Sequence, residues 1–338
     1  MKINNLKKKN RFDGNLLFGA KAFNKVTKRD KHLKKSKKDY DFKKLLNSKK
    51  IVSTKYTISR ACPVCGSSNE KSKIEFIKEG FVHRICNKCE MFYVSPILNK
   101  TISHKIHYKQ KSFNKVYDNP VQIKMDDKKF LYGLDIIQNF STKKNNNKLL
   151  DVGCGMGGFI KLAKKKNWTA EGIEFNEYSS KKLKEKGYKI YNDYIEKLDL
   201  KKDYDCVSMW NLFEHLPNPA LMLKNIRKIL LPNGLIFILV PNINGLVNAI
   251  LKDKAVAFAG YTHLNFFNIK SLRDLLKKNG FSVLHYETIF TEIETIKNYL
   301  NFKDPYLGSA PKSPNFFSAK FIHENYLGSK LIMVAKKN

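Results

Sequence analysis

A glycine-rich turn between an apolar segment and a helix is the residue pattern in this chain best suited to chemistry. Leu149–Val152 is typical of a buried strand, and three glycines follow it: Gly153, Gly155 and Gly157. Such a turn lets the backbone approach a ligand, and the N-terminus of the helix expected from Phe159 favours negative charge. Glu174 ends the next expected strand, where a carboxylate can accept hydrogen bonds from a ribose. The pattern predicts a nucleotide-cofactor site.

Two C-x2-C pairs, twenty residues apart, form the second pattern: Cys62, Cys65, Cys86 and Cys89. Pairs with this spacing can place four thiolates tetrahedrally around zinc, although two disulfides or four free thiols are alternatives. The apolar residues between the pairs predict two short strands joined around Glu79 and Gly80, a small zinc ribbon that needs its metal to fold. Because four thiolates leave no open position, the expected zinc is structural.

Three other side chains near these patterns have simpler interpretations. His83 is expected on the surface of the ribbon and not on the metal, because four cysteines already fill the site. Cys154 is expected to fill space in the glycine loop, and Cys206 is expected in a core strand. Six cysteines without a secretory signal favour a reducing compartment, so we expect a cytoplasmic protein. No apolar run reaches the length of a membrane span.

The formal net charge of +34 raises the question of a nucleic-acid partner. Of the 64 basic residues, 58 are lysine and six are arginine, whereas base readout and stacking favour arginine. The first 60 residues alone carry a net charge of +16. A basic arm whose charge is solvated is therefore the favoured interpretation, and nucleic acid remains a possible but less favoured partner.

The chain divides into four expected regions. Residues 1–50 form a basic, flexible arm; residues 51–110 form the zinc-ribbon module; residues 111–145 form a connecting helical segment; and residues 146–338 form a catalytic domain. Apolar residues between 119 and 140 recur at helical spacing, which predicts a helix that packs on the first strand of this domain.

Taken together, these motifs resemble class I S-adenosylmethionine-dependent methyltransferases with an N-terminal zinc-ribbon module. The D-x-G-x-G-x-G turn is similar to their first motif, and later segments match in the same order: residues 168–176, 189–198, 204–219, 233–241, 263–281 and 329–336. The resemblance implies an α/β fold, a Rossmann-like, doubly wound, seven-stranded sheet whose last strand is antiparallel. Glu90, which follows the fourth cysteine, departs from the glycine that is usual there.

The same resemblance supplies the expected cofactor contacts of S-adenosylmethionine. The glycine loop should approach the methionine portion, Glu174 the ribose hydroxyls and Asp193 the adenine edge, while Asn211 should line the pocket after the fourth strand. The full expected set is Asp151, Gly153, Gly155, Gly157, Glu174, Asp193 and Asn211.

Three side chains are candidate bases for removing a proton from the methyl acceptor: His263, His215 and Tyr261. Histidine titrates near neutral pH, which suits this role. His215 lies in a Glu-His turn after the fourth expected strand, where a structural role is the alternative. His263 lies between the fifth strand and the next helix, a region that caps the acceptor pocket in this fold.

Three functions compete for this sequence. The first is methyl transfer to a small molecule or glycan, with a sugar nucleotide or polysaccharide unit as the acceptor that the resemblance implies. The second is RNA methylation, with the ribbon and basic arm binding phosphates. Against it, Trp210-Asn211-Leu212-Phe213 stands where enzymes that methylate base amino groups carry Asn-Pro-Pro-aromatic. The third is a non-catalytic binding protein, which the intact glycines and acids at 151–174 disfavour.

Overall fold

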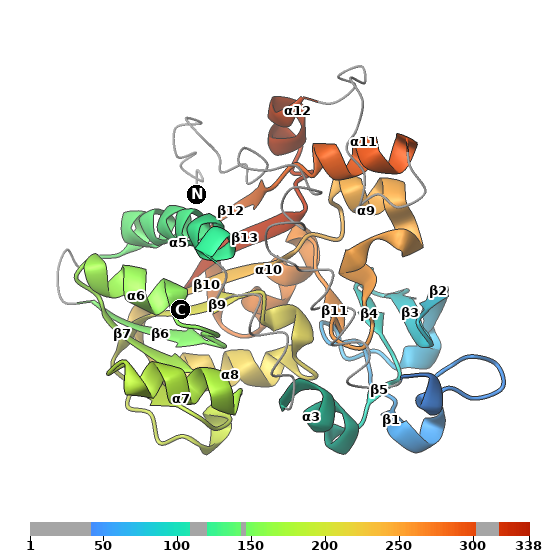
Figure 1. Ribbon diagram of the computed structural model, residues 1–338, viewed down its shortest axis with the longest axis horizontal. Coiled ribbons are helices and arrows are strands. Elements are labelled where there is room, and N and C mark those ends of the chain that lie inside the picture. Colours follow the sequence, from blue (N-terminus) through green and yellow to red (C-terminus); the bar gives the residue numbers. More distant parts are fainter. Residues whose placement is uncertain (1–41, 109–119, 143–146, 302–317) are drawn as a thin grey trace.

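The computed structural model describes residues 42–108, 120–142, 147–301 and 318–338, and the expected basic arm lies almost wholly outside these ranges. Its centre is a seven-stranded sheet with the order β12-β13-β10-β9-β6-β7-β8 (Figure 1). The strands are β6 Lys148–Val152, β7 Thr169–Ile173, β8 Ile190–Tyr191, β9 Tyr204–Trp210, β10 Leu230–Pro241, β12 Phe281–Ile289 and β13 Lys330–Lys337.

The topology of this sheet confirms the predicted doubly wound α/β fold. β6 pairs in parallel with both β7 and β9, so the chain changes direction across the sheet at β6. β13 is antiparallel to β10 on one side and to β12 on the other. In such sheets ligands bind beyond the carboxyl ends of the strands, beside the switch point. The glycine loop after β6 lies at this place.

Helices cover both faces of the sheet. Their bounds are α3 Lys100–Tyr108, α5 Pro120–Phe140, α6 Gly158–Lys165, α7 Glu177–Glu185, α8 Pro219–Ile229, α9 Leu246–Leu251, α10 Ile269–Lys278, α11 Ile293–Asn301 and α12 Ala319–Glu324. Apolar residues of α5 and α6 share one core with alternate residues of the strands, and those of α8 and α10 share the core on the opposite face. The strands are therefore buried on both sides, as their continuous apolar runs indicate.

Local sequence explains where several helices begin. Asn218 caps α8 by accepting a hydrogen bond from the amide of Leu221, and Pro219 occupies the first turn. Asn268 and Ser271 form a reciprocal capping box at the start of α10. α5 lies close against the sheet at Gly133, where an added Cβ would come within 2.3 Å of Trp210. The predicted helix at 119–140 is thus present, in the same core as Leu149 of β6.

The cysteine region forms the ribbon that its spacing predicts. β2 Ser72–Lys78 and β3 Phe81–Cys86 are antiparallel and joined by a turn at Glu79 and Gly80, whose φ angles are 52° and 84°. β4 Phe92–Val94 pairs with β3, and β1 Thr57–Ile58 pairs with β5 Ile97–Leu98. Glu90 has a φ of 60°, a left-handed conformation that explains why glycine suits this position.

A short strand from the second half of the chain joins the ribbon sheet, which the sequence did not predict. β11 Asn265–Phe266 pairs antiparallel with β4, which gives the order β11-β4-β3-β2 and places orange and cyan segments side by side (Figure 1). The ribbon and the catalytic domain therefore share one sheet.

The expectation that His83 lies on the surface of the ribbon was wrong. Its side chain is fully buried, stacked on Phe76 and in contact with Phe92, Phe258 and Phe266. Its Nδ1 donates to the carbonyl of Phe81, and burial lowers the pKa of His83 to about 4. The physical reason is the docking of the catalytic domain on this face, which turns a surface of the isolated ribbon into an interior.

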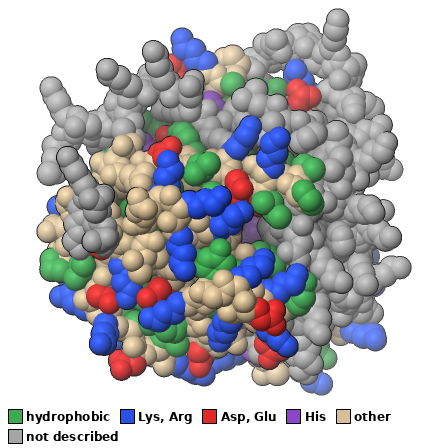
Figure 2. Space-filling model, turned by 60° about the vertical axis from the view of Figure 1, so that its left-hand side comes forward, with side chains coloured by type: hydrophobic (Ala, Val, Ile, Leu, Met, Phe, Trp, Pro, Cys, Tyr) green, Lys and Arg blue, Asp and Glu red, His purple; other side chains and the backbone are tan. Residues whose placement is uncertain are grey.

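On the face that carries the left side of Figure 1, blue side chains are spread widely, and red side chains lie among them, mostly in the lower part of the view (Figure 2).

Across the four described ranges, every helix is too short or too polar to cross a membrane.

Candidate functional site

The loop between β6 and α6 forms a cradle with open space at its centre. Gly153, Gly155 and Gly157 all have left-handed φ angles, at 74°, 55° and 74°. A Cβ added at Gly153 or Gly157 would press on a leucine side chain, whereas one at Gly155 would meet no atom within 4 Å. The backbone beside Gly155 is therefore exposed to a ligand at the N-terminal end of α6, where amide groups favour negative charge.

Glu174 faces this loop from the carboxyl end of β7. Its two carboxylate oxygens accept hydrogen bonds of 2.7 Å from the amides of Gly155 and Asn176. Burial raises the pKa of Glu174, and the two backbone amides act in the opposite direction. A carboxylate held by amides keeps further lone pairs available, so it can also accept from ribose hydroxyls.

Asp151 lies beneath the loop and is fully enclosed. Its carboxylate accepts a hydrogen bond of 2.7 Å from the hydroxyl of Ser208 on β9. The pKa of Asp151 is raised to about 7: desolvation is the largest cause, the Ser208 hydroxyl opposes it, and the nearby Glu174 charge adds to it. Asp151 thus links the first and fourth strands of the expected fold at the base of the cofactor loop.

The two remaining cofactor candidates lie at the same edge. Asp193 follows β8, and its carboxylate accepts from the amide of Tyr194 and pairs with Lys197. Asn211 directly follows β9 in a left-handed conformation, with a φ of 51°. Its side-chain oxygen accepts a 2.7 Å hydrogen bond from Lys330. The carboxyl ends of β6, β7, β8 and β9 therefore bring the expected cofactor residues to one edge.

Two histidines predicted as acceptor-side residues lie against each other beside this edge. The ring centroids of His215 and His263 are 4.9 Å apart. Nδ1 of His215 is 2.7 Å from the carbonyl of Thr262, and Nδ1 of His263 is 2.6 Å from the carbonyl of Ala257. Because a carbonyl oxygen only accepts, Nδ1 must be the protonated nitrogen in both rings. Each Nε2 is then the atom left for chemistry.

The environments of the acceptor-side residues differ. Burial lowers the pKa of His263 well below its ordinary value, with the neighbouring His215 as the next cause, so the ring is neutral near pH 7. His215 is partly exposed, at 32% of its side chain. Tyr261 lies in the same loop, and burial raises the pKa of its phenol.

Glu214 is a residue that our sequence reasoning passed over. It precedes His215 in the 3-10 turn Phe213–His215, and its side chain is 1% exposed. Neither carboxylate oxygen has a hydrogen-bond partner among the described residues. Burial raises the pKa of Glu214, and His215 and Lys330 oppose this. The signal was available as an acidic residue next to a histidine at the end of a strand.

Arg60 is a second residue that the sequence did not single out. Its guanidinium comes from the ribbon and is partly buried, and this desolvation lowers its pKa to about 10. It donates to the carbonyls of Val94 and Pro217 and to the side-chain oxygen of Asn265. One side chain therefore links the ribbon, the loop after Glu214 and β11.

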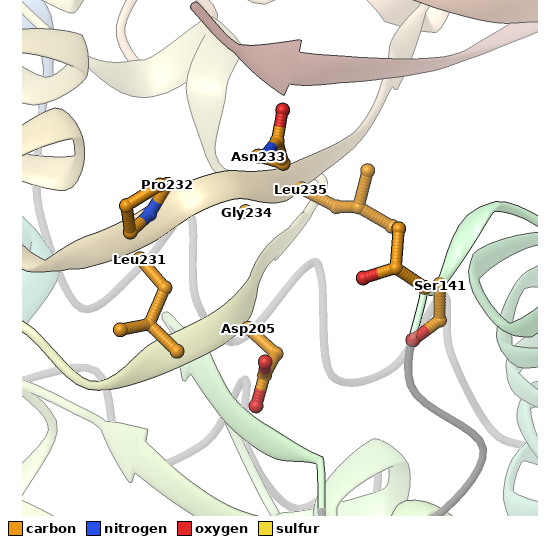
Figure 3. Close-up of a pocket in the computed structure, with 8 residues that line it drawn as sticks. Ser141, Asp205, Leu231, Pro232, Asn233, Gly234 and Leu235 are labelled. Carbon is orange, nitrogen blue, oxygen red and sulfur yellow. The ribbon is translucent and has the colours of Figure 1, made fainter.

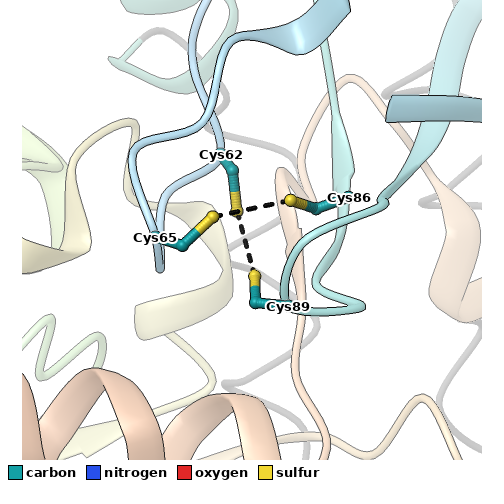
Figure 4. A group of neighbouring side chains, drawn as sticks. All are labelled: Cys62, Cys65, Cys86 and Cys89. Atoms are coloured by element: carbon teal, nitrogen blue, oxygen red, sulfur yellow. Dashed lines mark hydrogen bonds between the residues drawn. The ribbon is translucent and has the colours of Figure 1, made fainter. Parts of the chain in front are cut away.

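The four ribbon cysteines converge at one point (Figure 4). The Sγ atoms of Cys62 and Cys89 are 3.5 Å apart, as are those of Cys65 and Cys86, and all four are free thiols. Cys154 and Cys206 are also free and buried, the latter completely, in agreement with their expected packing roles.

A cavity of about 190 Å³ lies elsewhere, at the opposite edge of the sheet. Figure 3 shows Ser141, Asp205 and Asn233 at its walls. Asp205 lies near the start of β9, so the cavity is at the amino ends of the parallel strands. Ligands of open α/β sheets bind at the carboxyl ends, and we therefore assign no cofactor to it.

Known proteins match the catalytic part of the chain. Residues 125–286 match the family model of a methyltransferase domain. An uncharacterized protein from Methanocaldococcus jannaschii is 25% identical over 149 residues, which are 44% of this chain and 71% of that protein. A ubiquinone biosynthesis O-methyltransferase from Actinobacillus pleuropneumoniae is 26% identical over 116 residues, 31% of this chain and 50% of that enzyme. A solved S-adenosylmethionine-dependent methyltransferase from Archaeoglobus fulgidus is 24% identical, covering 63% of this chain and 99% of that chain, with a TM-score of 0.43.

The family match and the strand order agree with the glycine loop and its acids. Residues 125–286 thus match a methyltransferase domain, and a four-cysteine cluster lies before them. The alignment covers half the length of the ubiquinone enzyme.

We predict that Asp151→Asn removes part of the pH dependence of folding stability. The pKa of Asp151 is about 7 in the folded protein and about 4 in an unfolded chain. Between these values the folded state holds a proton that the unfolded state has lost, so this group makes stability fall as the pH rises from about 4 to about 7. Urea unfolding should show that the free energy of unfolding falls less between pH 5 and pH 8 for the variant than for the wild type, by on the order of a few kcal/mol.

Asp199→Asn is the matched control, since Asp199 is exposed and its substitution removes the same charge. If Asp151→Asn and Asp199→Asn change the pH dependence equally, the Asp151 carboxyl does not titrate as described.

Proposed function

We propose that this enzyme transfers the methyl group of S-adenosylmethionine to a small molecule or a glycan, with a sugar nucleotide or polysaccharide unit as the expected acceptor. The observation that favours such an acceptor over RNA is that the two arginines of the ribbon are already hydrogen-bonded within the protein. Arg60 donates to Val94, Pro217 and Asn265, as described above. Arg84 donates to the carbonyl of Ser95 at 2.9 Å and lies 3.4 Å from the hydroxyl of Ser72.

Arginines whose N–H groups donate to main-chain carbonyls stabilise the fold, and they have few N–H groups left to bind phosphates. This disfavours the second candidate, an RNA methyltransferase that binds through its ribbon. The ubiquinone relative is an O-methyltransferase, which supports a small acceptor whose oxygen is methylated.

For the cofactor we propose the contacts expected from the sequence. The backbone around Gly155 would approach the methionine portion, Glu174 the ribose and Asp193 the adenine edge. Asn211 would line the pocket, where its oxygen is oriented by Lys330. Asp151 would hold the loop in position through Ser208. The open space beside Gly155 supports this placement.

For the acceptor we propose the neighbourhood of His263, His215 and Tyr261. Methyl transfer is an in-line displacement in which positioning contributes most of the rate, and removal of the acceptor proton contributes where the acceptor is a hydroxyl. Either imidazole can act on an acceptor only through Nε2, because its Nδ1 is bonded to a carbonyl.

We propose a structural zinc ion at the four ribbon cysteines. Thiolates at about 2.3 Å from a tetrahedral zinc stand roughly 3.8 Å apart. The observed 3.5 Å separations fit this geometry, and the thiols are free. When bound, the ion would hold the two knuckle turns together, and the thiolates would leave it no open position for chemistry.

We retain the division into an arm at 1–50, a ribbon at 51–110, a helical segment at 111–145 and a catalytic domain at 146–338 as a proposal. The family match begins at residue 125, within α5. The six free thiols support the proposal of a reducing, cytoplasmic setting.

The proposed activity predicts where the methyl group goes. With S-adenosylmethionine labelled in its methyl group, the purified enzyme should label the low-molecular-mass or glycan fraction of a cell extract, and ribonuclease should not reduce the incorporation. Transfer of the label into RNA would contradict the proposal and support the alternative.

We predict that Glu174→Ala weakens binding of S-adenosylmethionine by roughly 1.5–3 kcal/mol, because ribose hydroxyls lose a charged acceptor. Isothermal titration calorimetry measures the change. Glu185→Ala is the control, since Glu185 is an exposed acid at the end of α7, the helix that follows Glu174, and its substitution should leave the affinity unchanged. Equal affinities of the two variants would mean that Glu174 does not contact the ribose.

We predict that Cys89→Ser lowers the zinc content of the purified protein by one ion per chain and decreases its thermal stability. A ribbon of this size depends on its metal for folding. Elemental analysis by mass spectrometry checks the content. Cys206→Ala removes a buried thiol outside the cluster and should leave the zinc content unchanged, and an equal content in Cys89→Ser would refute the site.

A further inference from the structure

We propose that Glu214, His215 and His263 form a second metal site, one that binds a divalent first-row transition metal and an oxygen of the methyl acceptor. Their ligand atoms, one from each side chain, all lie within 4.8 Å of one another. Ligands on opposite sides of one ion, at bond lengths of about 2.1 Å, are about 4.2 Å apart. The three ligand atoms therefore lie only slightly farther apart than the ligands of one ion.

The hydrogen bonds of the two histidines prepare them for this role. Nδ1 of His215 donates to Thr262 and Nδ1 of His263 donates to Ala257, so each ring presents the lone pair of Nε2. Histidines that bind metals commonly donate their other nitrogen to a backbone carbonyl in this way, which fixes the tautomer and the ring orientation. Nε2 of His215 already lies 3.8 Å from Oε1 of Glu214.

The third ligand is a side chain whose burial lacks another explanation. Glu214 is 1% exposed, and both of its oxygens lack a hydrogen-bond partner in the described ranges. A buried carboxyl without partners is costly, because its desolvation is not offset by new bonds. A divalent cation between Glu214 and the two imidazoles would supply the missing interaction.

The ligand set indicates the kind of ion and its function. Two imidazoles and one carboxylate suit zinc, iron, manganese or cobalt ions, and three protein ligands leave positions open for another molecule. This is unlike the ribbon, where four thiolates close the coordination sphere. Asn211 of the expected cofactor pocket lies three residues before Glu214, and Leu212 packs on Gly153 of the glycine loop. The open positions would thus be next to the methyl donor.

This inference rests on the proposed function and narrows its acceptor to a hydroxyl compound. A divalent ion lowers the pKa of an oxygen that it binds. The acceptor hydroxyl would release its proton to water, and its oxygen would form a bond to the methyl carbon. The bond between that carbon and the sulfonium sulfur would break, and S-adenosylhomocysteine would leave as a neutral thioether. An acceptor with two adjacent oxygens would use two open positions.

Manganese(II) separates the two metal sites, since carboxylate and imidazole ligands accept it and thiolates disfavour it. In the full-length protein with its ribbon zinc in place, the electron paramagnetic resonance signal of free manganese should fall as one ion binds per chain. Glu214→Gln and His263→Gln should each raise the Kd at least tenfold. Glu287→Gln is the matched control, because the buried pair His285–Glu287 has a 3.4 Å contact but no third ligand in the described chain, and binding should be unchanged.

If Glu214→Gln fails to fold, His215→Gln decides, since its side chain is partly exposed. Undiminished binding in the folded ligand variants would overturn the site, as would a wild-type protein that binds no manganese, cobalt or zinc beyond the ribbon zinc. Calorimetry with S-adenosylmethionine distinguishes a failure of the metal site from a failure of the proposed function. Cofactor binding without metal binding overturns the metal site alone, and metal binding without cofactor binding overturns the proposed function.

Discussion

The arrangement of the acceptor side depends on one backbone segment that is bonded on both edges. The carbonyl of Leu264 accepts a 3.0 Å hydrogen bond from Val94 of the ribbon, and its amide donates at 2.9 Å to the carbonyl of Glu214. The residue before it is His263, and β11 begins directly after it. Because the N–H and the C=O of Leu264 both take part in these bonds, this residue links the ribbon, the histidine loop and the Glu214 turn.

Arg60 reinforces this arrangement from within. A guanidinium is costly to bury unless its N–H groups find acceptors, and here they reach Val94, Pro217 and Asn265. Asn265 in turn donates to the carbonyl of Leu216 at 2.8 Å. The ribbon is consequently a wall of the methyltransferase domain.

The cofactor side depends on different constraints. The glycine loop is held by its own strand crossing, where the amide of Gly153 donates at 2.8 Å to the carbonyl of Ile173. Glu174 and Asp151 then bond to the loop and to β9, respectively. These contacts involve the parallel strands near the switch point and no residue of the ribbon. The two halves of the site meet at Asn211 and Glu214, which are three residues apart.

The sequence by itself determined the seven-stranded fold and the ribbon, because these follow from local signals. Glycine spacing, strand alternation and C-x2-C pairs are patterns within a few residues. The local structure that they predict depends little on distant contacts. The role of each predicted site residue stays a prediction. The tertiary structure alone decided that His83 is buried, that β11 completes the ribbon sheet, and that Glu214 meets His263. These facts depend on how two surfaces dock. His263 and Glu214 are nearly fifty residues apart in sequence, and no local periodicity records a contact across that distance.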